Sequence, residues 1–63
     1  MDKAKLVPGR KYLHHRRIII EARQMEAERW LRCLKITETG AVFRHEFEVL
    51  ELTDQEIREQ LVN

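Results

Sequence analysis

The sequence predicts a mainly β domain of the α+β class, a small antiparallel meander followed by a short C-terminal helix. Three features of its second half lead to this prediction. Apolar and charged residues alternate from Phe43 to Val49, as in a strand with one buried face. Residues 37–40 have the composition of a tight turn between strands. Residues 53–56 have that of a helix start.

The first fifteen residues contain one strong turn signal. Residues 1–5 are mostly polar, and residues 1–6 are expected to be disordered. Residues 7–9 read Val-Pro-Gly, which predicts a turn because proline fixes φ and glycine permits positive φ. A short strand is expected over residues 11–15.

Residues 16–35 allow two interpretations. The β-branched run Ile18-Ile19-Ile20 favours strands over residues 17–23 and 30–36, joined through residues 24–28. On the second strand, Trp30, Leu34 and Ile36 would share one face. The alternative is a helix over about residues 16–35, since residues 21–29 are mostly good helix formers. That helix, a hairpin wing and a second helix would make a winged-helix-like domain.

The second half is more clearly patterned. Residues 37–40 suit a type I turn closed by Gly40 in the left-handed conformation. Thr53 and Glu56 form a capping-box pattern, in which each side chain bonds to the other residue's backbone amide. Leu52 and Ile57 are placed to form the matching hydrophobic staple. The core-facing residues of the strand before this helix are predicted to be Phe43, His45, Phe47 and Val49.

The order of these elements resembles that of SH3-like barrels. A Pro-Gly turn, three or four strands and then a helix are common to that architecture. The resemblance is one of architecture alone. It implies that the meander curls into a barrel.

The length of 63 residues predicts a single domain, 1–63, with a small core. Domains of this size usually need a disulfide, a metal or a partner. Cys33 is the only cysteine, so an internal disulfide is not possible, and a protein partner or a homodimer is expected. A lone thiol and the lack of a signal-like or membrane-spanning apolar run predict a cytoplasmic location with no membrane contact.

Charge is distributed unevenly along the chain although the formal net charge is only +1. The first third is basic and the last third is acidic, so the two ends either neutralise each other or present a basic surface for phosphates. The candidate nucleic-acid or partner-binding residues in the basic segment are Arg10, Lys11, Tyr12, His14, His15, Arg16 and Arg17. The cations would neutralise phosphates while the tyrosine stacks on a base.

No catalytic, metal or cofactor site is expected. Cys33, His14, His15 and His45 lack the paired spacing of zinc ligands, and adjacent histidines on a strand point to opposite faces. A nucleophilic pair of Cys33 and His45 would lack a third orienting group and an oxyanion loop. Cys33 is therefore predicted to be a buried thiol.

The sequence thus favours a small non-enzymatic protein-interaction module or adaptor. An exposed apolar strip would be its partner-binding surface. The residues predicted for this strip are Phe43, His45, Phe47, Ile57 and Leu61. The alternative is a DNA- or RNA-binding domain that uses the basic N-terminal segment.

Overall fold

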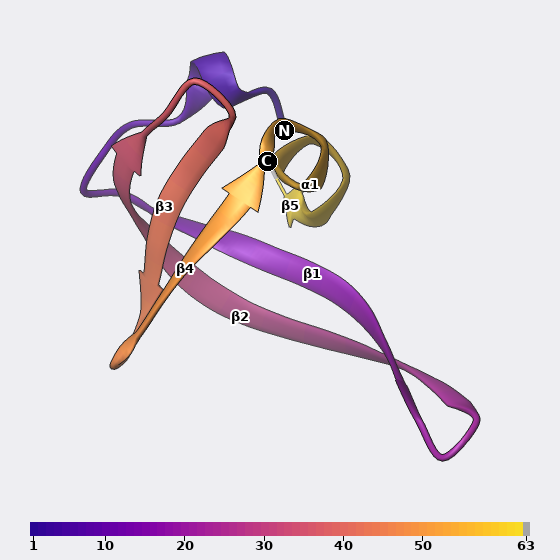
Figure 1. Ribbon diagram of the computed structural model, residues 1–63. Helices are drawn as coiled ribbons and strands as arrows, with labels where there is room; N and C mark the ends of the chain where they lie inside the picture. The colour runs from indigo at the N-terminus through magenta and orange to yellow at the C-terminus, as the bar shows by residue number, and fades with distance from the viewer. Residues whose placement is uncertain (63) are drawn as a thin grey trace.

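The computed structural model describes residues 1–62, which form one five-stranded antiparallel sheet with the strand order β4-β3-β2-β1-β5 (Figure 1). The elements are η1 (Lys3–Lys5), β1 (Lys11–Ile20), β2 (Arg23–Ile36), β3 (Gly40–His45), β4 (Glu48–Thr53), α1 (Asp54–Gln60) and β5 (Leu61–Val62). The predicted mainly β meander with a short C-terminal helix is confirmed, and the winged-helix alternative is wrong. The sheet does not close into a barrel, since β4 and β5 remain its two edges and α1 packs near both.

A single long hairpin of β1 and β2 replaces the three shorter strands that the sequence predicts over residues 11–15, 17–23 and 30–36. β1 and β2 pair without a break from Lys11 opposite Arg32 to Ile20 opposite Arg23. The connection is Glu21 and Ala22, both in the left-handed region with φ of 51° and 62°. Two-residue hairpin turns usually carry glycine or asparagine at such positions. The prediction of a connection over residues 24–28 is wrong, since these residues are paired in β2. The sequence does not indicate the true turn, because it contains neither glycine nor asparagine.

Two further turns connect β2 to β3 and β3 to β4. The predicted turn at residues 37–40 is confirmed, with the Thr37 amide donating to the Gly40 carbonyl at 2.9 Å. The prediction that Gly40 adopts the left-handed conformation is wrong, since its φ is not positive. The β3–β4 turn is Glu46-Phe47, with Glu46 at a φ of 54°. Uninterrupted alternation hides this turn in the sequence, so the single strand expected over residues 43–49 is wrong.

The core lies between the sheet and α1. Its buried side chains are Leu6, Leu31, Cys33, Ala41, Phe43, Leu52, Ile57 and Leu61. On β2 the buried residues are Leu31 and Cys33, whereas Trp30 is 58% exposed. The prediction that Trp30, Leu34 and Ile36 share one face is wrong, because β2 bulges between Cys33 and Lys35 and Ile36 then pairs with the buried Ala41, on the face opposite to Trp30. A one-residue change of phase exchanges the two faces of a strand.

The helix start is as predicted. The Glu56 amide donates to Thr53 Oγ1 at 3.2 Å, and the Thr53 amide donates to Glu56 Oε1 at 3.0 Å. Leu52 and Ile57, the predicted staple, are both buried. The capping box and the staple thus fix where α1 begins and how it packs against the sheet.

The first residues pack against the body, which corrects the expectation that residues 1–6 are disordered. Leu6 is buried, and Lys3 Nζ lies 2.8 Å from Asp54 Oδ1. The predicted turn at residues 7–9 is present, with Gly9 at a φ of 92° and its amide donating to the Cys33 carbonyl at 2.7 Å. The N-terminal segment is held because it contributes an apolar side chain to a small core.

The outer half of the β1–β2 hairpin projects away from the body as an arm (Figure 1). We define the arm as residues 15–28. On one side, β5 pairs with β1 only at Leu13 and His14. On the other, β3 pairs with β2 only from Arg32 onward. The arm is therefore a two-stranded ribbon with open edges, and it contributes to the elongated shape of 35 × 24 × 19 Å.

Candidate functional site

The predicted basic segment does not form one surface. Alternate residues of β1 point to opposite faces of the sheet. Tyr12, His14 and Arg16 lie on the face that carries the buried Leu31, which we call the inner face. Lys11, His15 and Arg17 lie on the other, outer face. Arg10 precedes the strand and is exposed. The segment is therefore divided between two faces, although its residues are adjacent in sequence.

Two residues of the basic segment hold the fold together. Tyr12 is partly buried, and its hydroxyl accepts a hydrogen bond from the Val7 amide at 2.8 Å. His14 is only 2% exposed, and its Nε2 lies 2.7 Å from Gln60 Oε1 on α1. Arg29 Nε donates to His14 Nδ1 at 3.3 Å. This network fits a neutral imidazole with its proton on Nε2, since Nδ1 accepts.

Burial of the imidazole lowers the pKa of His14 below its ordinary value of 6.5, and the cations of Arg29 and Arg16 act in the same direction. The Gln60 hydrogen bond and the Glu56 charge oppose this shift. In the unfolded chain His14 takes up a proton at higher pH than in the native protein. Stability is therefore complete above pH 6.5 and falls as the pH decreases below that value.

We expect the free energy of unfolding to fall between pH 7.5 and 5.5, by at most about 1.4 kcal/mol per pH unit from this residue. Urea titrations at both pH values measure the effect. His14→Gln is the control, because its amide can occupy the same place without titrating. An equal decrease in the variant would show that other groups cause the pH dependence.

The predicted apolar partner strip is largely the core of the protein. Phe43 and Ile57 are fully buried and Leu61 is 4% exposed. His45 is partly buried and its Nδ1 lies 3.1 Å from the Trp30 carbonyl oxygen. Phe47 alone is free, since it lies in the β3–β4 turn with its side chain fully exposed. These five residues therefore do not form one partner-binding surface.

The arm presents a different apolar strip on its inner face. Its residues directly continue the rows of β1 and β2 that cover the core within the body. We name Ile18, Ile20, Met25 and Ala27 the arm strip. Ile18 pairs with Met25, and both Ile20 and Met25 are about half exposed. Within the body α1 covers this face, but the arm strip extends past the helix (Figure 1).

Cations border the arm strip on the same face. Arg16 lies next to Ile18 toward the body, and Arg23 pairs with Ile20 near the tip. Among residues 1–62, Arg16 Nε is buried with no hydrogen-bond partner. The carboxylates of the arm strands lie on the opposite face, at Glu26 and Glu28. The inner face of the arm thus combines an apolar centre with a basic rim.

The groove at the base of the arm adds two acids to this surface. It has a volume of about 340 Å³ and separates the arm from β4 and α1. Glu51 and Glu56 line its body side, and Arg16 and Arg29 line its arm side. Arg29 Nη1 lies 3.5 Å from Glu48 Oε2, so this cation is already paired with a carboxylate. Arg16 and Arg23 are the cations that border the strip.

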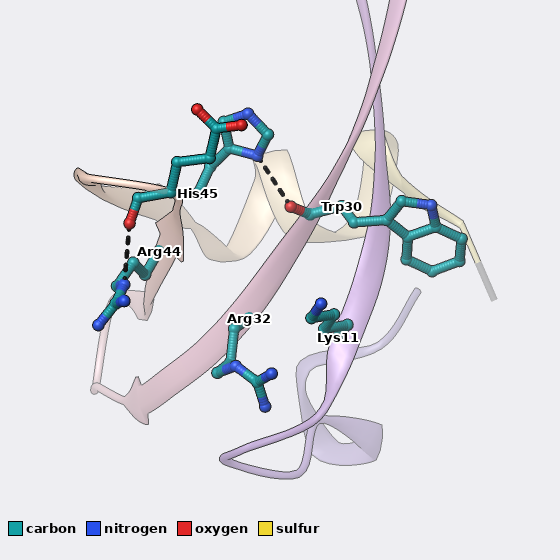
Figure 2. Close-up of a pocket in the computed structure, with 6 residues that line it drawn as sticks. Lys11, Trp30, Arg32, Arg44 and His45 are labelled. Carbon is teal, nitrogen blue, oxygen red and sulfur yellow. Dashed lines mark hydrogen bonds between the residues drawn. The ribbon is translucent and has the colours of Figure 1, made fainter.

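The outer face of the sheet carries a group of cationic side chains beside an exposed tryptophan. Lys11, Arg32 and Arg44 stand directly opposite one another on β1, β2 and β3, and we call them the cationic row. Trp30, two residues before Arg32, projects from the same face. Together with His45 and Glu46 they line a hollow of about 390 Å³ (Figure 2). In Figure 2 the Lys11 and Arg32 side chains lie between Arg44 and the indole ring.

Sequence reasoning missed most of both surfaces. Only Lys11 of the cationic row belongs to the predicted basic segment, because the other cations come from strands that are distant in sequence. The isoleucine run was visible, but its exposure depends on where the body ends. Cations at facing positions of neighbouring strands are the signal that identifies the cationic row. That signal becomes visible only when the register of the strands is known.

The remaining chemical candidates are the Cys33 thiol and the potential metal ligands. Cys33 is fully buried, and burial raises the pKa of its thiol, which keeps it in the protonated, weakly nucleophilic form. Within residues 1–62, no three His, Cys, Asp or Glu side chains gather closely enough to hold a metal ion. In the same part of the chain, no helix has the length and apolar character needed to cross a membrane.

Comparisons of this chain with protein-family models, curated proteins and solved structures found no match.

Proposed function

We propose that this protein is a non-enzymatic interaction module that binds another protein through the inner face of its arm. The observation that carries the proposal is the arm strip, an apolar row continuous with the core that nothing within residues 1–62 covers at its outer end. A two-stranded ribbon with open edges is marginal in water. A partner that covers this face would stabilise the arm while it binds.

The charges around the strip indicate the chemistry of the partner. Arg16 and Arg23 border the apolar residues, and among the described residues neither forms an ion pair with a carboxylate. Carboxylates of a partner would pair with these guanidinium groups through charge-assisted hydrogen bonds. The partner is therefore a protein segment with apolar side chains flanked by aspartate or glutamate.

A second copy of this chain fits the same face less well. Two inner faces packed together would bring Arg16 and Arg23 of one copy near the same cations of the other. Like charges in close proximity destabilise such a contact. The proposal therefore commits to a different, acidic partner.

A pair of designed peptides tests the proposed function. The first alternates leucine and glutamate, and the second alternates leucine and lysine. We expect the Leu/Glu peptide to shift the amide NMR signals of residues 16–20 and 23–27, and the Leu/Lys peptide to leave them in place. Equal shifts with both peptides would contradict the charge argument. A dimer in sedimentation experiments, with the arm as its interface, would overturn the choice of partner.

Neighbouring isoleucines on opposite faces provide a matched pair of variants. Ile20→Glu places a charge in the arm strip, whereas Ile19→Glu places the same charge on the outer face. We expect Ile20→Glu to weaken binding of the Leu/Glu peptide at least about 10-fold, because apolar contact is lost and like charges meet. Ile19→Glu should bind within about twofold of the parent. Fluorescence anisotropy of the labelled peptide measures both, and equal losses would exclude the inner face as the site.

A further inference from the structure

The cationic row on the outer face has no internal explanation. Directly opposed like charges destabilise a sheet. Neighbouring strands lie about 4.8 Å apart, so Lys11, Arg32 and Arg44 are held within about 10 Å across three strands. Among residues 1–62 none of the three forms an ion pair with a carboxylate. Arg32 donates to the Gly9 carbonyl and Arg44 to the Glu46 carbonyl, contacts that orient the guanidinium groups but leave their charge uncompensated.

An exposed indole stands beside this row. Trp30 is 58% exposed and borders two hollows, of about 390 Å³ and about 320 Å³. Lys11 lines both of them. The second hollow is mainly apolar and includes Leu13 and Val62. A large aromatic ring on a sheet surface, open on either side, is available for stacking against a planar group.

Cations and a free aromatic ring on one sheet face are the two parts of a single-strand nucleic-acid platform. The cations neutralise backbone phosphates, and the ring stacks on a base whichever its identity. We infer that the outer face binds single-stranded DNA or RNA, with phosphates on Lys11, Arg32 and Arg44 and a base on Trp30. Duplexes fit less well, because their bases are already stacked on each other.

Two acids define the limits of this platform. Glu46 lines the hollow beside Arg44, and Glu28 lies one outer-face position beyond Trp30. They restrict phosphate contacts to the region between Trp30 and the row. The predicted footprint is therefore short, with about three phosphate contacts.

This inference is independent of the proposed function. The arm strip lies on the inner face, and the cationic row lies on the outer face. Substitutions that remove binding at the arm strip leave the residues of the cationic row unchanged, and the reverse also holds. The two surfaces could also be occupied at the same time.

Intrinsic fluorescence gives a direct test, since Trp30 is the only tryptophan. The full chain is titrated with an eight-nucleotide oligothymidylate at several salt concentrations. We expect Trp30 emission to be quenched on binding. We also expect log K to fall against log salt with a slope of about −2, as three contacts to a single strand require.

Variants identify the contacts through the anisotropy of a labelled oligothymidylate. Arg32→Gln and Arg44→Gln keep a donor for their backbone carbonyls but remove the charge, and each should reduce the slope by about 0.7. Trp30→Ala should weaken binding about 5- to 150-fold, and Trp30→Phe should restore part of it. Arg58→Ala, which removes an exposed cation of α1, is the control and should bind as the parent does.

Several results would overturn the inference. These are unchanged Trp30 emission at saturating oligonucleotide, an unaltered salt slope in both glutamine variants, or a duplex that binds as tightly as the single strand. A polyglutamate peptide that competes equally well would reassign the face to acidic proteins. Circular dichroism of each variant confirms that the sheet is intact before its binding is compared.

Discussion

Phe43→Ala is expected to lower the free energy of unfolding by about 3–5 kcal/mol. Phe43 is fully buried at the centre of the core between the sheet and α1. Truncating a buried phenylalanine to alanine costs about 3–5 kcal/mol, because transfer energy is lost and a cavity remains. A domain of 63 residues has a total stability of about 3–9 kcal/mol at the usual value per residue. One substitution therefore removes a large part of the total.

Phe47→Ala is the matched control for this experiment. Both phenylalanines belong to the same alternating pattern, but Phe47 is fully exposed in the β3–β4 turn. Its replacement should change the free energy of unfolding by less than about 0.5 kcal/mol. Circular dichroism with urea titration measures both variants, and Phe43→Leu gives a folded variant whose smaller loss can be quantified. Similar losses at positions 43 and 47 would contradict the burial described here.

Gly40→Ala is expected to lower stability by about 3 kcal/mol, even though it adds a single methyl group. A β-carbon at this position would overlap the Leu52 carbonyl oxygen and lie 2.8 Å from the carbonyl carbon. It would also lie 2.9 Å from Thr53 Cα. These are backbone atoms of the paired strand β4, so relief requires β3 and β4 to separate rather than a side chain to rotate. Overpacking of this kind costs at the upper end of about 1–3 kcal/mol.

Thermal unfolding should show this loss as a decrease of about 12–24 °C in Tm. Gly9→Ala is the comparison, because Gly9 has a φ of 92° but open space where a β-carbon would lie. That change should cost about 1–2 kcal/mol through backbone strain alone. A Tm loss at position 40 equal to or smaller than the loss at position 9 would refute close approach as the reason for Gly40.

Several parts of the fold could be predicted because their causes are local. The capping box of Thr53 and Glu56 lies within four residues, and the hairpin at 37–40 is equally compact. The turns at Glu21-Ala22 and Glu46-Phe47 could not be predicted. Their left-handed residues are types that rarely adopt this conformation. Strand pairing on both sides imposes the turn on them.

The candidate sites were harder to predict than the fold. Ile18, Ile19 and Ile20 indicate a strand, but only the short length of β5 and β3 leaves them outside the body. Arg32 and Arg44 are unremarkable in sequence and become a feature only when they face each other across two strands. Phe43 and Phe47 look equivalent until the intervening turn separates them.

The sequence by itself determined that this chain forms a mainly β meander, with a hairpin at residues 37–40 and a capped helix from Asp54. These features depend on hydrogen bonds and preferences within a few residues. Tertiary structure alone decided which apolar residues are buried, where the arm leaves the body and which cations meet on the outer face. Those outcomes depend on strand register, which is set by pairing between distant segments, and a shift of one residue exchanges the two faces of the strand.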